Sequence, residues 1–237
     1  MKNIKFSQED ITNMRKIIET HEGELWSVHQ CVWDLRFCNK DATAEFWLSF
    51  LFNEWIVVRS VTFMNKWTET FTEVMAYCEQ FAKNNRVSKI VIQSVGTDEL
   101  SQWCRKYGYK PNPSASVNVG GFVFGDYEKD MDAERKRDEN REKFKDLPIK
   151  IGDKVRMNAS MMIKDAIADG QIAINCPSYV VDHPPKTRPT QHLYYMVDHP
   201  DEVYTVERYD LDSPDAPYIL SGAMSGYSWG DNDLIPV

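Results

Sequence analysis

Residues 71–95 read FTEVMAYCEQFAKNNRVSKIVIQSV and carry the clearest structural signal in the chain. In the first part, apolar residues recur at intervals of three and four: Phe71, Val74, Met75, Cys78, Phe81 and Ala82. That spacing places them on one face and predicts an amphipathic helix over residues 71–85. The apolar run KIVIQSV (89–95) is short and predicts a buried strand. A helix that leads directly into a buried strand is typical of sheets with helices on their faces.

Similar patterns flank this unit on both sides. Upstream, we expect a helix at QEDITNMRKIIET, then strands in ELWSVHQCVWDLRF, AEFWLSFLFN and WIVVRSVTF, with a turn at Asn53-Glu54. Downstream, DELSQWCRKYGY predicts a helix that ends at Gly108, since glycine best adopts the left-handed cap conformation. SVNVGGFVFGDY predicts one or two further strands. The order therefore predicts an α/β (α+β) fold, with a mixed sheet flanked by helices.

Composition excludes several classes of protein. Seven Trp, eleven Tyr and eleven Phe argue against a disordered chain. The sequence has no apolar run long enough to span a membrane, and its start, MKNIKFSQED, lacks the apolar stretch of a signal peptide. The five cysteines show no CxxC spacing, so we expect a cytoplasmic protein without a disulfide framework. A net charge of −8 disfavours direct nucleic-acid binding.

The charged stretch DYEKDMDAERKRDENREKFKDLP (126–148) separates two regions of different character. We expect a first domain at 1–128, a charged linker or surface helix at 129–148, and a second domain at 149–237. The second domain has short strand candidates punctuated by Gly, Pro and Asp, interrupted by an insertion at 158–200. This pattern predicts a small all-β barrel. His183, His192 and His199 fit no standard zinc spacing, and we expect no metal site.

The segment FTEVMAYCEQFAKNNRVSKIVIQSVGTDELSQWCRKYGYKPN (71–112) resembles the GNAT (Gcn5-related N-acetyltransferase) superfamily. The similarity lies in a helix ending FAKNN, a strand, and a helix ending KYGYKPN. Together with the element order, it covers a little over half of the chain. It implies a GNAT-like fold and, for an active member, transfer of an acyl group from acetyl-CoA or another acyl-CoA to an amine. The second domain resembles an SH3-like barrel, and the combination suggests a phage protein.

The sequence departs from the family where the cofactor binds. Members place (Q/R)xxGx(G/A) between the fourth strand and the next helix, where backbone N–H groups hold the CoA pyrophosphate. Here Lys66 takes the basic position, while Glu69 and Phe71 replace the glycines. A structural explanation is also complete, with Thr68 as helix cap and Phe71 in the core. If acyl-CoA binds, the resemblance implies contacts from Phe63, Asn65, Lys66 and Thr68.

The general acid is also replaced. Many members use a tyrosine in the later helix, and alignment on Gly108 places Cys104 there. Tyr107 lies three residues further on. Cys104 and Tyr107 are therefore the catalytic candidates of an active enzyme, although a small buried cysteine is the commoner explanation for Cys104.

Two functions remain open. The first is a binding module that has lost its cofactor, a phage-type inhibitor of a host nucleic-acid enzyme or defence system, acting in the host cytoplasm. Its partner would be a host protein with a basic surface, and the candidate partner-binding residues are Asp201, Glu202, Glu207, Asp210, Asp212 and Asp215. The alternative is an N-acyltransferase acting on an amine of a protein, nucleic acid or small molecule. The sequence does not determine the oligomeric state.

Overall fold

The computed structural model describes residues 4–52, 54–158, 201–222 and 225–237. The chain divides into two compact units, Met1–Arg135 and Lys136–Val237. None of the helices in these described ranges combines the length and apolar character that crossing a bilayer requires.

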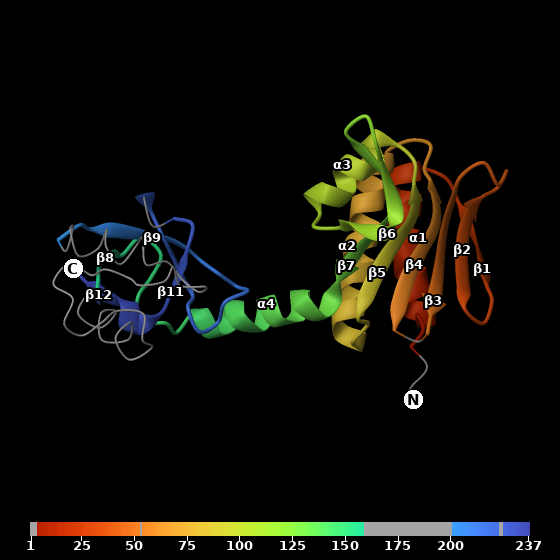
Figure 1. Ribbon diagram of the computed structural model, residues 1–237. Coiled ribbons are helices and arrows are strands. Elements are labelled where there is room, and N and C mark those ends of the chain that lie inside the picture. The colour runs from red at the N-terminus through yellow and green to blue at the C-terminus, as the bar shows by residue number, and fades with distance from the viewer. Residues whose placement is uncertain (1–3, 53, 159–200, 223–224) are drawn as a thin grey trace. The chain divides into compact units, whose positions relative to one another are not determined.

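The first unit is a mixed α/β structure (Figure 1). Its helices are α1 (Gln8–Glu22), α2 (Trp67–Asn85) and α3 (Asp98–Lys106). Its strands are β1 (Trp26–Gln30), β2 (Asp34–Asn39), β3 (Glu45–Leu51), β4 (Trp55–Thr62), β5 (Lys89–Val95), β6 (Lys110–Val119) and β7 (Phe122–Asp130). In the described residues they form one sheet in the order β1-β2-β3-β4-β5-β7-β6. Only β4 and β5 pair in parallel among these strands, so the predicted mixed sheet is confirmed.

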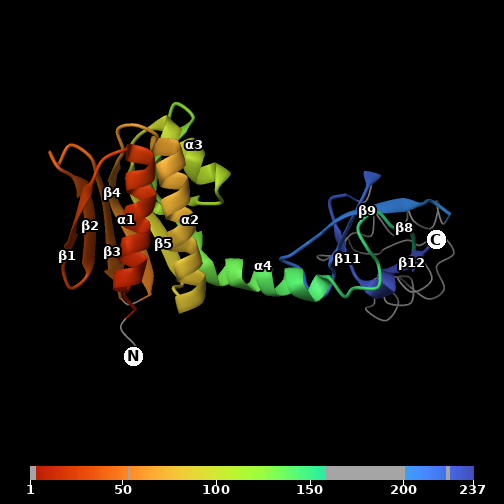
Figure 2. The same ribbon diagram turned by 180° about the vertical axis from the view of Figure 1, so that it is seen from behind.

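Helices α1 and α2 lie side by side on one face of this sheet (Figure 2). All six apolar residues predicted to share a face of α2 are buried there, which confirms that pattern. Helix α1 begins with a capping box, because Ser7 accepts from the Asp10 N–H and Asp10 accepts from the Ser7 N–H. The core of the unit lies between this helical layer and the sheet.

One local prediction is corrected and another is confirmed. Residues 24–37, expected as one strand, form the hairpin of β1 and β2, because the chain turns where the Cys31 N–H donates to the Asp34 carbonyl at 2.9 Å. Helix α3 ends at Lys106, and Gly108 follows with a φ of +83°, in agreement with the predicted stop. Asn53, at the predicted turn, lies outside the described residues.

The charged stretch contains helix α4 (Met131–Phe144), and the division between the units falls within it. The second unit has β8 (Lys154–Met157), β9 (Tyr204–Tyr209), β10 (Tyr218–Leu220), β11 (Ser228–Trp229), the short 3-10 helix η2 (Asp231–Asp233) and β12 (Leu234–Pro236). Its described strands form a sheet in the order β11-β10-β9-β8-β12, with antiparallel neighbours. Apart from Asn158, the predicted insertion lies outside the described residues.

Candidate functional site

Strands β4 and β5 part before they end. Their parallel pairing runs from Trp55↔Lys89 to Val58↔Ile92, while β4 continues to Thr62 and β5 to Val95. A cleft of about 440 Å³ lies where they separate and where α2 and α3 begin. It is lined by Val61, Thr62, Phe63, Trp67, Ser94, Gly96, Thr97, Glu99 and Leu100. This is the junction at which the GNAT resemblance implies a cofactor.

The side-chain carboxylate of Glu22 lies beside the segment that leads into α2. The N–H groups of Met64 and Asn65 donate to Glu22 Oε2 at 2.8 and 3.1 Å. The Lys66 N–H and the Thr70 hydroxyl donate to Glu22 Oε1 at 3.4 and 3.0 Å. Glu22 is only 3% exposed. Backbone N–H groups at the start of a helix attract anions, and here an internal anion accepts from the N-cap residue Lys66 and from the two residues before it.

The end of α1 positions this carboxylate. Glu22 is the last residue of α1, and Gly23 ends the helix in the left-handed conformation at a φ of +74°. The Asn65 side-chain amide also donates to the Glu22 carbonyl oxygen at 2.5 Å. Hydrogen bonds to Glu22 therefore connect the carboxyl end of α1 to the segment that leads into α2.

The predicted cap of α2 is wrong. Helix α2 begins at Trp67, its N-cap residue is Lys66, and that residue makes no side-chain cap hydrogen bond. Thr68 lies within the first turn, where its carbonyl accepts from the Thr72 hydroxyl at 2.6 Å. The N–H of Lys66 itself donates to Glu22, which belongs to a distant helix.

The other residues considered for the cofactor have mixed environments. Phe63 lies in the core at the edge of the cleft, and Phe71 is fully buried, as its structural explanation requires. Lys66 and Glu69 are exposed. The indole N–H of Trp67 donates to Glu99 Oε1 at 2.7 Å, which links the first turns of α2 and α3 beside the cleft.

The two catalytic candidates do not line the cleft. Cys104 is fully buried, and this burial raises the pKa of its thiol to about 12. A thiol in that state neither forms a thiolate nor releases its proton readily. The Tyr107 ring stacks on Trp103 with a centroid separation of 4.5 Å.

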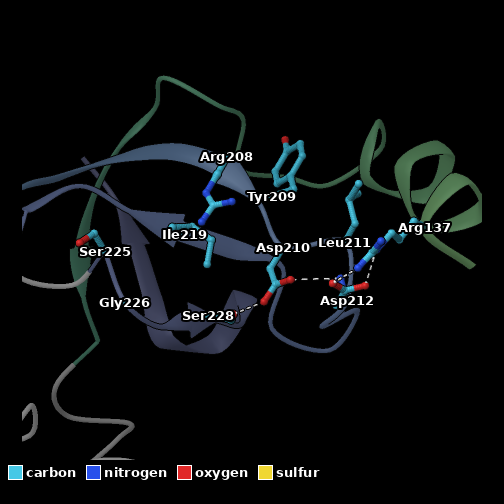
Figure 3. Close-up of a pocket in the computed structure, with 10 residues that line it drawn as sticks. All are labelled: Arg137, Arg208, Tyr209, Asp210, Leu211, Asp212, Ile219, Ser225, Gly226 and Ser228. Atoms are coloured by element: carbon cyan, nitrogen blue, oxygen red, sulfur yellow. Dashed lines mark hydrogen bonds and ion pairs between the residues drawn. The ribbon is translucent and has the colours of Figure 1, made fainter. Parts of the chain in front are cut away.

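A pocket of about 420 Å³ in the second unit brings together two predicted partner-binding residues, Asp210 and Asp212 (Figure 3). Asp212 accepts two hydrogen bonds from Arg137, at 2.7 and 2.8 Å. Asp210 accepts from the Ser228 hydroxyl and from the Asp212 N–H. Burial pushes the pKa of Asp210 upward, but these hydrogen bonds outweigh it and lower that pKa. Both carboxylates therefore have internal partners.

The remaining acidic candidates are spread over the second unit. Asp201 is exposed and lies 3.4 Å from Arg156. Glu207 and Asp215 are exposed, and Glu202 is partly buried.

Sequence reasoning missed Glu22, although a signal was present. An acidic residue directly before a helix-ending glycine stands at the negative end of the helix dipole, where carboxylates are disfavoured. Such a position indicates that the carboxylate has a partner elsewhere in the fold.

No protein-family model matches the chain, and no curated protein matches it. Among solved structures, it is similar to a protein described as an N-acetyltransferase from Lactobacillus plantarum, with 10% identity, 53% of this chain and 93% of that chain covered, and a TM-score of 0.30. It is also similar to a GNAT-family acetyltransferase from Staphylococcus aureus Mu50, with 12% identity, 54% and 82% coverage, and a TM-score of 0.30. At these scores the likeness assigns neither a family nor an activity.

Proposed function

We propose that this protein is a non-catalytic binding protein with a GNAT-like fold, and that it acts by binding another macromolecule rather than by using acyl-CoA. One observation carries the proposal: the Glu22 carboxylate accepts from the N–H groups of Met64, Asn65 and Lys66, in the segment that leads from β4 into α2. A pyrophosphate at this junction would have to displace that carboxylate or accept its repulsion. Hydrogen bonds to a charged group contribute about 1.5–3 kcal/mol each, so displacement is costly.

Two further features support the same function. The exposed Glu69 carboxylate adds negative charge to the first turn of α2. The raised pKa of Cys104 makes it a poor general acid. Neither feature favours acyl transfer from an anionic cofactor.

The partner assignment is the finer part of the proposal. We infer a host protein with a basic surface, bound by a phage-encoded inhibitor in the host cytoplasm. Support comes from the net charge of −8 and from the exposed carboxylates of Asp201, Glu207 and Asp215. We also propose that residues 149–237 form an SH3-like barrel, which the antiparallel order of β8 to β12 supports.

The second candidate is an acyl-CoA-dependent N-acyltransferase, and the cleft between the parting ends of β4 and β5 favours it. In that function, Asn65 and Lys66 would hold the pyrophosphate, Phe63 and Thr68 would flank the cofactor, and Cys104 or Tyr107 would protonate the CoA sulfur. The acceptor would be an amine.

Calorimetric titration with acetyl-CoA separates the two functions. We expect no heat of binding with the native protein at millimolar acetyl-CoA. Binding tighter than about 100 μM would overturn the non-catalytic proposal. If binding is found, Lys66→Ala should weaken it, because a charge-assisted phosphate contact is lost. Arg86→Ala, at the opposite end of α2, is the matched control.

A further inference from the structure

A second hollow in the first unit, of about 390 Å³, lies on the sheet face opposite α1 and α2. Its lining consists of Trp33, Asp34, Ser49, Phe50, Leu51, Phe52 and Arg59. Side chains alternate between faces along a strand, so Ser49 points away from the core that contains Leu48 and Phe50. The hollow is thus separate from the cleft at the start of α2.

A bulge in β4 presents Arg59 to this hollow. Trp47 lies opposite Ser60 and Leu48 lies opposite Val58, which leaves Arg59 as the extra residue. Bulges re-aim side chains and are frequent beside functional sites. The Arg59 Nε–H donates to the Ser49 hydroxyl at 3.1 Å, and Nη1 donates to Gln93 Oε1 at 2.6 Å.

Both of these partners of Arg59 are neutral. Among the described residues, no carboxylate oxygen lies within 4.0 Å of its guanidinium. The nearby carboxylate of Asp34 accepts instead from the Ser49 hydroxyl and from the Trp47 indole, at 2.5 and 3.3 Å. Asp34 therefore orients Ser49, whose oxygen accepts from Arg59. A guanidinium has five N–H donors, and the remaining ones are available to a ligand.

Exposed aromatic side chains line the same hollow. Trp33 is 48% exposed and Phe52 is 72% exposed. Phe52 adopts a φ of +56°, a region that bulky residues rarely enter. Its ring packs edge-on against Trp55 with a centroid separation of 5.5 Å. The positive φ belongs to the turn that joins β3 to β4, where the Glu54 N–H donates to the Leu51 carbonyl at 3.1 Å, and this turn holds the ring at the surface beside the hollow.

We propose that this hollow binds a carboxylate flanked by an apolar side chain, presented by a protein partner as an Asp or Glu beside a Leu, Phe or Trp. The fork of a guanidinium matches a carboxylate, and tryptophan and arginine dominate the energetics of protein interfaces. In the described part of the chain, Arg59 is the one cationic side chain in the lining of this hollow, and the protein has a net charge of −8. Such a site does not suit the phosphate backbone of a nucleic acid. The identity of the occupant as a protein rests on the proposed function, whereas carboxylate binding does not.

The test uses 3-phenylpropionate as the probe and its uncharged analogue 3-phenylpropionamide as the comparison. Both are titrated into ¹⁵N-labelled full-length protein while the Arg59 Nε–H and Trp33 Nε1–H signals are followed. We expect saturable shifts at both signals with millimolar affinity for the acid. The amide should bind at least about tenfold more weakly, because it lacks the charge that the guanidinium pairs with.

Variants assign this effect to Arg59. Arg59→Gln should weaken phenylpropionate binding at least about tenfold, and Arg59→Lys should give an intermediate loss because it keeps the charge without the fork. Arg36→Gln is the matched control, since it removes the same charge from β2, which β3 separates from β4. Arg36 already pairs with Glu45 at 2.7 Å, so its loss should leave the affinity for the acid unchanged.

Equal affinity for acid and amide, or unchanged binding by Arg59→Gln, would overturn the proposal. Sedimentation of the native protein tests a second copy as the occupant. If a concentration-dependent dimer forms and Arg59→Gln abolishes it, the occupant of the hollow is a second copy of this chain and not a different protein. These outcomes are independent of the acetyl-CoA titration, so failure here leaves the argument from Glu22 intact.

Discussion

Two charged side chains lie near β4: Glu22 contacts the residues just after its end, and Arg59 projects from the strand itself. Their surroundings differ. Glu22 is buried and accepts hydrogen bonds from three backbone N–H groups and one hydroxyl. Arg59 is half-buried and donates to two neutral groups beside exposed aromatic rings. A charge with a full set of internal partners maintains the fold, because its loss leaves buried groups unsatisfied. A charge with neutral partners remains available to an external ligand of opposite sign.

Removing Glu22 should have the largest effect on stability. Glu22→Ala should lower the free energy of unfolding by about 3 kcal/mol, because three partly buried N–H groups and one buried hydroxyl lose their acceptor. Urea denaturation followed by circular dichroism measures the change. Glu22→Gln is the matched control and should cost less, because its amide keeps one acceptor oxygen. If Glu22→Ala lowers the free energy of unfolding by less than about 1 kcal/mol, Glu22 does not maintain the fold and the distinction between Glu22 and Arg59 is wrong.

Lys129 offers a second internal charge, and Lys129→Met should destabilise by about 2–3 kcal/mol. Lys129 Nζ lies 2.8 Å from Glu79, which also accepts from the Tyr109 hydroxyl, and its side chain is 11% exposed. The control is Lys89→Met, whose ion pair with Glu128 is 2.9 Å long and more exposed. That change should cost less than about 1 kcal/mol. Equal losses in thermal or urea unfolding would contradict this ranking.

Phe52 tests whether the binding face carries strain. Phe52→Gly should raise the free energy of unfolding by about 0.5–1 kcal/mol, because glycine adopts a φ of +56° freely. The same change should weaken phenylpropionate binding, since one wall of the hollow is lost. Phe52→Ala removes the ring but keeps the strained Cβ, so it should weaken binding without the gain in stability.

Asp10 should show the smallest effect, because it forms a local and exposed capping box with Ser7 at the start of α1. Burial pushes the pKa of Asp10 upward, but hydrogen bonds from Ser7 and Tyr77 outweigh it and lower that pKa. Its stabilisation is therefore present above the usual pKa and is lost as pH falls through the folded value. Asp10→Asn should cost about 0.5 kcal/mol at neutral pH. In urea titrations the difference between the two proteins should disappear in strong acid; a constant difference would argue against this role.

Local sequence patterns correctly predicted the helices whose spacing or capping residues lie within or directly beside the helix itself. The apolar spacing of α2 and the glycine after α3 both mark their elements, because periodicity and capping act over a few residues. The turn between β1 and β2 was missed because Cys31, Val32 and Trp33 are not turn-forming residues.

The two sites depend on contacts that no local pattern contains. Glu22 meets Met64 across 42 residues, and the cap of α2 could not be assigned without that contact. The role of Arg59 arises from a shift in the register between β3 and β4. Such a shift follows from the packing of the whole sheet rather than from the residues of one strand.

The position of Glu22 also has a consequence for the order in which the chain folds. Residues 8–22 are synthesised before their donors at Met64, Asn65 and Thr70, which follow Glu22 by 42, 43 and 48 residues. Strands β1 to β4 must be synthesised in between, and contacts between distant residues form slowly. Until then α1 carries an unpaired carboxylate at the end where its own dipole repels it. The contacts of α1 are therefore completed only after the junction of β4 and α2 has formed.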